Sequence, residues 1–271
     1  MRLLRASLLL LLAIACDVSP AWAQLSIYKP SRPSIGEQYH LEVAIGLWNP
    51  TPAITISSDH LSLVGSTIDA VADLGIAQVK FPEASFVLRF AKKHKIRAQY
   101  IPLKYSAEAV LTRTVRFQGV DYQVGVPVTS SLEWKAYRVG YEYDVVYRDG
   151  GFLGIVAELK YADVKASLAS PVVSGAAVAR APVPALGAIA RVYVARNFSL
   201  TAEATGFKLP ESWWPGRRAR YVDLDAYASA NFSDNVGAQA GYRSLDVMYR
   251  VSGDAGTMTL KGPYVRAVVR F

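Results

Sequence analysis

Apolar and polar residues alternate with a period of two along most of this chain, and the pattern is clearest in residues 260–271. From Pro263 onward one set of alternate positions is apolar and ends on Phe271, while the other set carries Arg266 and Arg270. Successive side chains of a β-strand point to opposite faces, so this pattern predicts a strand with one apolar and one charged face.

The same alternation recurs upstream and predicts about ten strands, whose connections are alternately long and tight; counts of eight or twelve stay open because weak strands are easily miscounted. Within the long connections we expect a short helix at 67–74 capped by Ser66, a hairpin centred on Gly119, and a Pro- and Ala-rich loop at 170–184. The predicted strands cover residues 38–48, 84–91, 96–109, 132–147, 153–161, 186–195, 199–207, 221–232, 236–251 and 260–271.

The closing segment resembles the last strand of bacterial outer-membrane β-barrels, a class in which a terminal aromatic residue after alternate apolar positions is the assembly signal. The resemblance implies an all-β fold: a closed, antiparallel, up-and-down transmembrane β-barrel over residues 38–271 in the bacterial outer membrane. Phe271 would then be read by the barrel assembly machinery. Apolar faces would contact lipid and polar faces would line the lumen.

A soluble β-sandwich or a lipocalin-like barrel would show the same alternation with the faces inverted. Such a protein would have to pack the apolar faces into one core. These faces are rich in Tyr or in Ala, and close packing requires complementary shapes, whereas lipid fills any outline. The composition of the apolar faces therefore favours the membrane barrel.

Residues 1–23 have the pattern of a secretory signal peptide, with two arginines, a short apolar run, and Ala21 and Ala23 in the small-residue cleavage positions. Cleavage after Ala23 would leave a polar periplasmic leader at 24–37. Two alternatives stay open: an N-terminal membrane anchor, for which the apolar run is short, and a lipoprotein signal that would place a lipid on Cys16.

The amino-acid composition narrows the classes of molecule that this protein could bind. The net charge is +8, with Lys and Arg spread along the chain and no basic run with interleaved aromatics, which argues against nucleic acid and favours anionic outer-membrane lipids and lipopolysaccharide. Sixteen Tyr suit aromatic girdles. The single Cys lies in the signal and only three His are present, so we expect no disulfide, no metal site and no cofactor. The oligomeric state is left open.

Acids and bases occur in nearly equal number on the predicted polar faces. Unpaired charges in a narrow barrel are costly, so we expect them to form ion pairs that largely occlude the lumen, which suits a structural or interaction role. A small porin for small solutes is the alternative, and it would need a gap through this network. The predicted network consists of Glu42, Arg89, Arg97, Arg138, Glu142, Asp144, Glu158, Lys160, Arg191, Glu203, Asp223, Asp225, Arg243, Arg266 and Arg270.

A hydrolase at the extracellular rim is a second alternative. Asp223 and Asp225 lie two residues apart at the predicted outer end of a strand, where their carboxylates could share a proton or activate water. They distantly resemble the acidic pair of the omptin proteases, for which only His60 offers a partner. The sequence from His60 to Ser62 also resembles the His-x-Ser of outer-membrane lipid hydrolases, although here it falls in a predicted loop. For both motifs we favour salt-bridged or solvated side chains, and we expect no catalytic residues.

The predicted outer loop after strand 199–207 is rich in aromatic and basic residues. Their side chains would contact lipopolysaccharide phosphates at the extracellular rim or anchor the barrel at the membrane interface. These residues are Trp213, Trp214, Arg217 and Arg218.

Overall fold

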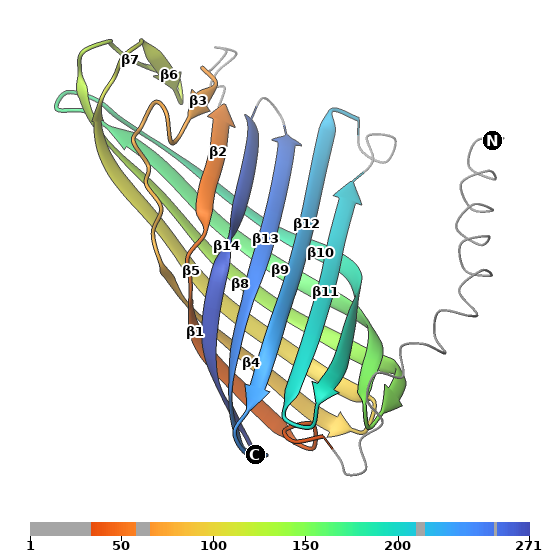
Figure 1. The fold of residues 1–271 in the computed structure, drawn as a ribbon. Helices are drawn as coiled ribbons and strands as arrows, with labels where there is room; N and C mark the ends of the chain where they lie inside the picture. The colour runs from red at the N-terminus through yellow and green to blue at the C-terminus, as the bar shows by residue number, and fades with distance from the viewer. Residues whose placement is uncertain (1–33, 58–65, 210–214, 252–253) are drawn as a thin grey trace.

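The computed structural model describes residues 34–57, 66–209, 215–251 and 254–271, which form a closed antiparallel β-barrel in up-and-down order (Figure 1). The first and last strands pair with each other and close the sheet. The predicted all-β fold with about ten strands is therefore confirmed. No helix in the described part of the chain is long and apolar enough to cross a bilayer.

The barrel wall begins with an interrupted strand made of β1 (Leu41–Trp48) and β2 (Thr51–Ser57), both paired with the last strand. Two short elements lie outside this wall: β3 (Ile68–Asp69), paired with β2, and the hairpin of β6 (Val115–Phe117) and β7 (Val120–Tyr122). The remaining wall strands are β4 (Phe81–Ala91), β5 (His94–Val110), β8 (Pro127–Arg148), β9 (Gly151–Ala169), β10 (Ser174–Ala195), β11 (Phe198–Leu209), β12 (Arg217–Asn231), β13 (Val236–Val251) and β14 (Asp254–Arg270).

The predicted helix at 67–74 is wrong. Residues 68–69 form β3, and the chain then turns, with the Asp69 carboxylate accepting the Val71 and Ala72 amides at 2.9 Å each. Ser66, the predicted cap, instead accepts the Arg116 amide at 2.9 Å. Pairing of Ile68 with β2 buries that side chain, which so short an isolated helix could not do alone.

The predicted loop at 170–184 is also wrong, because residues 174–184 belong to β10 and pair with β9. Pro182 and Pro184 interrupt no ladder between described residues, since pairing of β10 with β11 begins only at Leu186 and the outer half of β10 is an edge with no second partner strand in the described part of the chain. Proline is tolerated at such an edge. The predicted hairpin is confirmed, and Gln118 and Gly119 both have the positive φ of a tight turn.

The barrel wall has two zones, separated by a row of exposed tyrosines, Tyr100, Tyr137 and Tyr161, on adjacent strands. On the side of residues 34–37 and Phe271, outward residues such as Val139 and Ile155 are apolar and more than half exposed. Beyond the row the pattern inverts, and outward positions carry Lys104, Glu133, Asp163 and Arg180. The tyrosine row thus marks the outer edge of the lipid-facing band.

The interior beyond the tyrosine row is an apolar core. Trp48, Phe81, Tyr105, Leu132 and Trp134 are buried there together. A second cluster packs the β6–β7 hairpin against the inner faces of β8 and β9. The strands β5, β8, β9 and β10 extend farthest toward this hairpin (Figure 1). The outer part of the barrel is therefore built like a soluble protein, with its apolar side chains inside.

One residue of the predicted lipid face is misplaced. The pairing of β8 with β9 shifts register between Asp144 and Val146, which is a β-bulge, so Tyr147 turns inward instead of facing lipid. Its hydroxyl accepts a hydrogen bond from Arg89 Nη1 at 3.2 Å. The extra residue cannot be seen in a strictly alternating pattern.

Candidate functional site: the charge network of the lumen

Among the described residues, the membrane-embedded half of the lumen holds nine basic and nine acidic side chains, each at most 15% exposed and each within 4.0 Å of an opposite charge. The charges therefore balance. The basic residues are Arg89, Lys95, Arg97, Arg138, Lys160, Arg191, Arg243, Arg266 and Arg270; the acidic residues are Glu37, Glu42, Glu83, Glu142, Asp144, Glu158, Glu203, Asp223 and Asp225.

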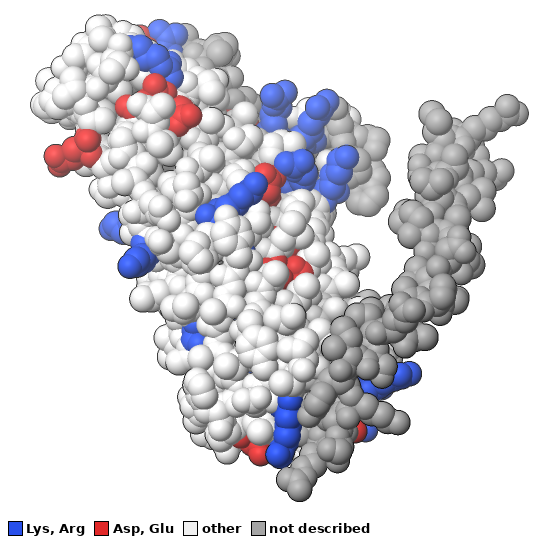
Figure 2. All heavy atoms as spheres, viewed as in Figure 1, with Lys and Arg blue, Asp and Glu red and all other residues white. Residues whose placement is uncertain are grey.

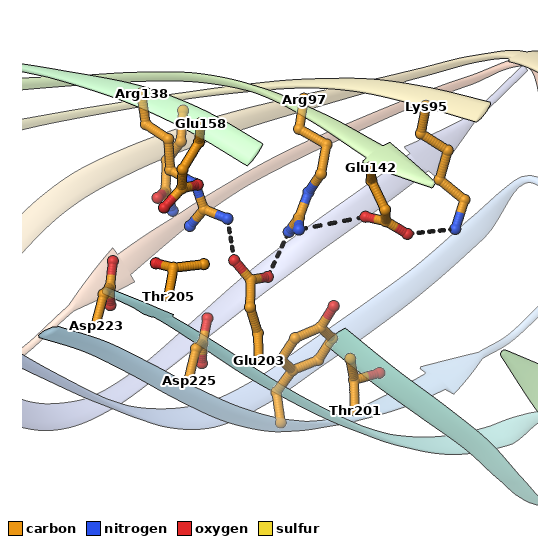
Figure 3. Close-up of polar contacts among 12 residues, drawn as sticks. Lys95, Arg97, Arg138, Glu142, Glu158, Thr201, Glu203, Thr205, Asp223 and Asp225 are labelled. Carbon is orange, nitrogen blue, oxygen red and sulfur yellow. Dashed lines mark hydrogen bonds and ion pairs between the residues drawn. The ribbon is translucent and has the colours of Figure 1, made fainter. Parts of the chain in front are cut away.

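Glu203 joins opposite walls of the barrel (Figure 3). Its Oε2 atom lies 2.6 Å from Arg97 Nη2 and its Oε1 atom accepts a bond from Arg138. Arg97 comes from β5 and Glu203 from β11, which are separated by three strands in the sheet order. The chain of contacts continues to Glu142, 3.2 Å from Arg97, and then to Lys95 at 2.6 Å. A line of alternating charges thus crosses the lumen.

Asp223 is the centre of a second group. Arg243 contacts both of its carboxylate oxygens, at 2.9 and 2.7 Å, and Lys160 Nζ lies 2.8 Å away. Arg266 binds both oxygens of Glu83, at 2.5 and 3.1 Å. Bidentate guanidinium–carboxylate pairs fix geometry as well as neutralise charge. These contacts tie β12, β13 and β9 together, and β14 to β4.

The end of the predicted leader closes the periplasmic mouth. The Glu37 carboxylate forms ion pairs with Arg89 Nη2 at 2.7 Å and with Arg191 Nη1 at 3.1 Å, so its side chain is one of the paired charges of the lumen. The backbone before it is bonded to three turns: Ser34 Oγ donates to the Asp149 carbonyl, the Ile35 amide to the Arg196 carbonyl, and the Gly36 amide to the Asp234 carboxylate. Residues 34–37 therefore lie across the barrel opening.

Gly36 permits this close approach. Its φ is +76°, and a Cβ there would lie 2.7 Å from Arg270 Nη1. Any other residue would be strained in this backbone conformation and would collide with the network.

A polar cavity of about 50 Å³ remains inside the network, lined by side chains that include Arg97, Gln99, Arg138, Gln239 and Arg266. One water needs roughly 10–15 Å³ of such volume, so the cavity has room for a few ordered waters. Guanidinium, carboxylate and amide groups of the lining offer polar partners for these waters.

The structure places the whole predicted network inside the barrel, including Arg270, whose Nε lies 2.5 Å from Glu42. It adds four polar members that the sequence analysis missed: Glu37, Glu83, Lys95 and Gln99. Glu37 had been assigned to the leader, and Glu83 and Lys95 lie one residue before the predicted strands 84–91 and 96–109. Glu83 and Lys95 continue the inward alternation of their neighbouring strands, and this signal could have found them. Glu37 has the opposite parity to the inward Glu42 of its neighbouring strand, so alternation could not have found it.

The acidic pair, Asp223 and Asp225, is engaged by partners inside the barrel. Asp223 and Asp225 lie in the middle of β12 and inside the barrel, not at an outer rim as expected. Both oxygens of Asp223 are engaged by Arg243, and Asp225 accepts the Tyr264 hydroxyl at 2.7 Å. Carboxylates held this way by cations are occupied as acceptors, which leaves no exposed pair to activate water.

The structure describes only some of the other predicted site residues. His60, Ser62, Trp213 and Trp214 lie outside the described residues, as do residues 1–33. Arg217 and Arg218 begin β12 and are exposed. Phe271 is 67% exposed beside the start of the barrel, and its backbone exchanges hydrogen bonds with Leu41.

Comparison with known proteins gives a likeness of fold. No family model matches the chain, and no curated protein matches it. The outer membrane protease OmpT of Escherichia coli has a similar structure, with a TM-score of 0.57, 9% identity, and coverage of 89% of this chain and 99% of that one. Ail of Yersinia pestis (TM-score 0.35, 8% identity, 84% and 99% covered) and the toluene transporter TodX of Pseudomonas putida (0.36, 8%, 90% and 91%) are less similar.

The closed barrel and its exposed apolar band define a transmembrane β-barrel, and the similarity to OmpT supports the same fold. The protein is an outer-membrane β-barrel of the bacterial envelope. A soluble β-sandwich or lipocalin-like barrel is thereby excluded, because the exposed apolar band of this barrel would then face water.

Proposed function

We propose that this protein is a non-conducting outer-membrane barrel, whose role is to anchor and present an extracellular β-structure. The observation that carries the proposal is the pair of layers that fill the interior. Ion pairs such as Arg97 with Glu203 cross the membrane-embedded half of the lumen, and the apolar core that includes Trp48 and Trp134 lies beyond them. Ions would have to break the first layer and cross the second.

The presented surface is the outward face of β5, β8, β9 and β10 beyond the tyrosine row. Lys104 and Glu133 pair across neighbouring strands at 3.0 Å, and Arg180 pairs with Asp163 at 3.2 Å. Surface pairs of this kind contribute little to stability. A mixed polar face on long strands that rise above the lipid band suits contact with other molecules at the cell surface.

Conductance distinguishes this role from a porin. We expect at most small, intermittent currents from the purified protein in planar bilayers. Arg138→Ala should raise them, because Glu158 and Glu203 then lose a shared partner and recruit water. Glu133→Ala, which removes an exposed charge beyond the tyrosine row, is the matched control and should change nothing. Steady, large single-channel steps from the unmodified protein would support the porin alternative instead.

A further inference from the structure

A patch of basic residues lies on the outer surface near the extracellular ends of β11, β12 and β13, where Figure 2 shows Lys and Arg gathered. Odd positions of β12 such as Tyr221 and Asp223 are buried, so the even positions Arg218 and Arg220 face outward. Lys208 on β11 and Arg250 on β13 complete the set, and all four are exposed. We call these four residues the basic patch.

The basic patch places like charges directly opposite one another. Lys208 pairs in register with Arg220, and Arg218 with Arg250. Like charges at directly opposed positions of an antiparallel sheet are destabilising. On the outer faces of these strands beyond Leu224, the described residues include one carboxylate, Asp246, which Arg220 Nη2 contacts at 2.5 Å. Lys208, Arg220 and Arg250 alone therefore carry more positive charge than Asp246 balances on these described outer faces, and an anionic ligand would relieve this excess.

A groove lies below the basic patch on the lipid-facing wall. Its volume is about 500 Å³ and its lining is almost entirely apolar. Small side chains form the floor, and bulkier ones such as Leu153, Leu224 and Tyr242 border it. The floor consists of Ala188, Ala190, Ala202, Ala204 and Ala226.

The groove and the patch share strands. Ala204 precedes Lys208 by four residues on β11, and Leu224 follows Arg220 by four on β12. Four residues of a strand span about 13 Å. The patch thus lies where the apolar wall ends, at the level of the outer-leaflet headgroups, and the groove lies at the level of the acyl chains.

We propose that this surface binds a phosphorylated glycolipid of the outer leaflet, with phosphates on the basic patch and an acyl chain in the alanine groove. Guanidinium groups bind phosphate oxygens bidentately, and basic residues near a membrane surface attract anionic headgroups. A free phosphate would use the patch alone. A glycolipid uses both features, and the charge of the patch selects a phosphorylated one.

Native mass spectrometry of the delipidated full-length protein in detergent tests this inference, with monophosphoryl and bisphosphoryl lipid A and their dephosphorylated form as probes. We expect wild type to retain bisphosphoryl lipid A. The double variant K208A/R250A should bind it about tenfold more weakly or worse, because two phosphate contacts are lost. Ala204→Phe, which fills the groove, should also weaken binding. K104A/K165A removes two exposed cations from β5 and β9, outside the patch, and should leave binding unchanged.

Inorganic pyrophosphate distinguishes a glycolipid site from a simple anion site. We expect it to compete weakly and with equal affinity for wild type and Ala204→Phe. Heat-modifiable migration on gels verifies that each variant is folded. Wild-type lipid A binding by K208A/R250A would refute the proposal, as would equal binding of the dephosphorylated lipid. Unchanged lipid A binding by Ala204→Phe would reject the groove and reduce the site to anion attraction.

Discussion

Replacement of Glu203 should destabilise the barrel more than any exposed charge deletion. The carboxylate bridges Arg97 and Arg138, and its side chain is only 4% exposed. Glu203→Gln keeps the shape but leaves the lumen with one surplus positive charge. Removing one partner of a buried ion pair costs about 3–5 kcal/mol. Arg97 keeps Glu142 at 3.2 Å and Arg138 keeps Glu158 at 2.5 Å, so we expect the lower end of that range.

Urea unfolding of the refolded protein in detergent micelles measures this cost. The matched control is Glu133→Gln, which breaks the exposed ion pair of Glu133 with Lys104. This variant should lose less than about 1 kcal/mol of unfolding free energy. The double variant E203Q/R138M restores the charge balance, so its destabilisation should fall short of the sum of the two single variants by about 0.5–3 kcal/mol. Additive effects, or a Glu203→Gln cost no larger than that of the control, would refute the view of the network as one coupled unit.

Three further outcomes follow from the wall and the outer segment. Val139→Arg should lower the free energy of unfolding in the same urea assay by roughly 2–4 kcal/mol, because it places a charge in the lipid band. Thr129→Arg, on the same outward face of β8 but beyond Tyr137, should lower it little. The opposite result would mean that the membrane surrounds the zone beyond the tyrosine row. Deletion of Phe271 should lower the amount inserted in cells but not refolding in micelles, and equal insertion would contradict its role as assembly signal. Hydrogen bonds from Arg113 lower the pKa of Asp73 below its ordinary value of 3.8. A lowered pKa contributes stability that is present above about pH 4 and lost as the pH falls through the folded value. Protection factors of the amides at residues 66–76, corrected for the intrinsic pH dependence of exchange, should therefore fall in acid for wild type and less so for Arg113→Ala.

The class of fold could be predicted from the sequence because lipid on one face and a polar lumen on the other impose strict alternation. That constraint acts residue by residue, and it identified the lipid-facing valines of β8 and the charged positions opposite them. It failed where the chain departs from alternation. The bulge that turns Tyr147 inward inserts one unpaired residue, and the outer half of β10 looks like a loop because its prolines break the usual strand signal.

The sequence also offered two interpretations that excluded each other, a membrane barrel and a soluble one with inverted faces. The structure contains both in succession: charge inside and apolar residues outside below the tyrosine row, and the opposite above it. Period-two alternation specifies which residues share a face but not which face is inside. Only closure of the sheet assigns that.

The sequence by itself determined which charged residues share one face of each predicted strand, since that depends on local parity alone. It did not determine which partners meet. Arg97 and Glu203 are 106 positions apart in the chain, and Glu37 reaches Arg191 across 154 positions. Such contacts depend on barrel diameter, strand tilt and stagger, which are properties of the closed sheet as a whole. The tertiary structure alone therefore decided how the nine acids and nine bases of the described lumen pair. Thirteen of them form one connected series of ion pairs, while Glu37 pairs with Arg89 and Arg191, and Arg270 pairs with Glu42.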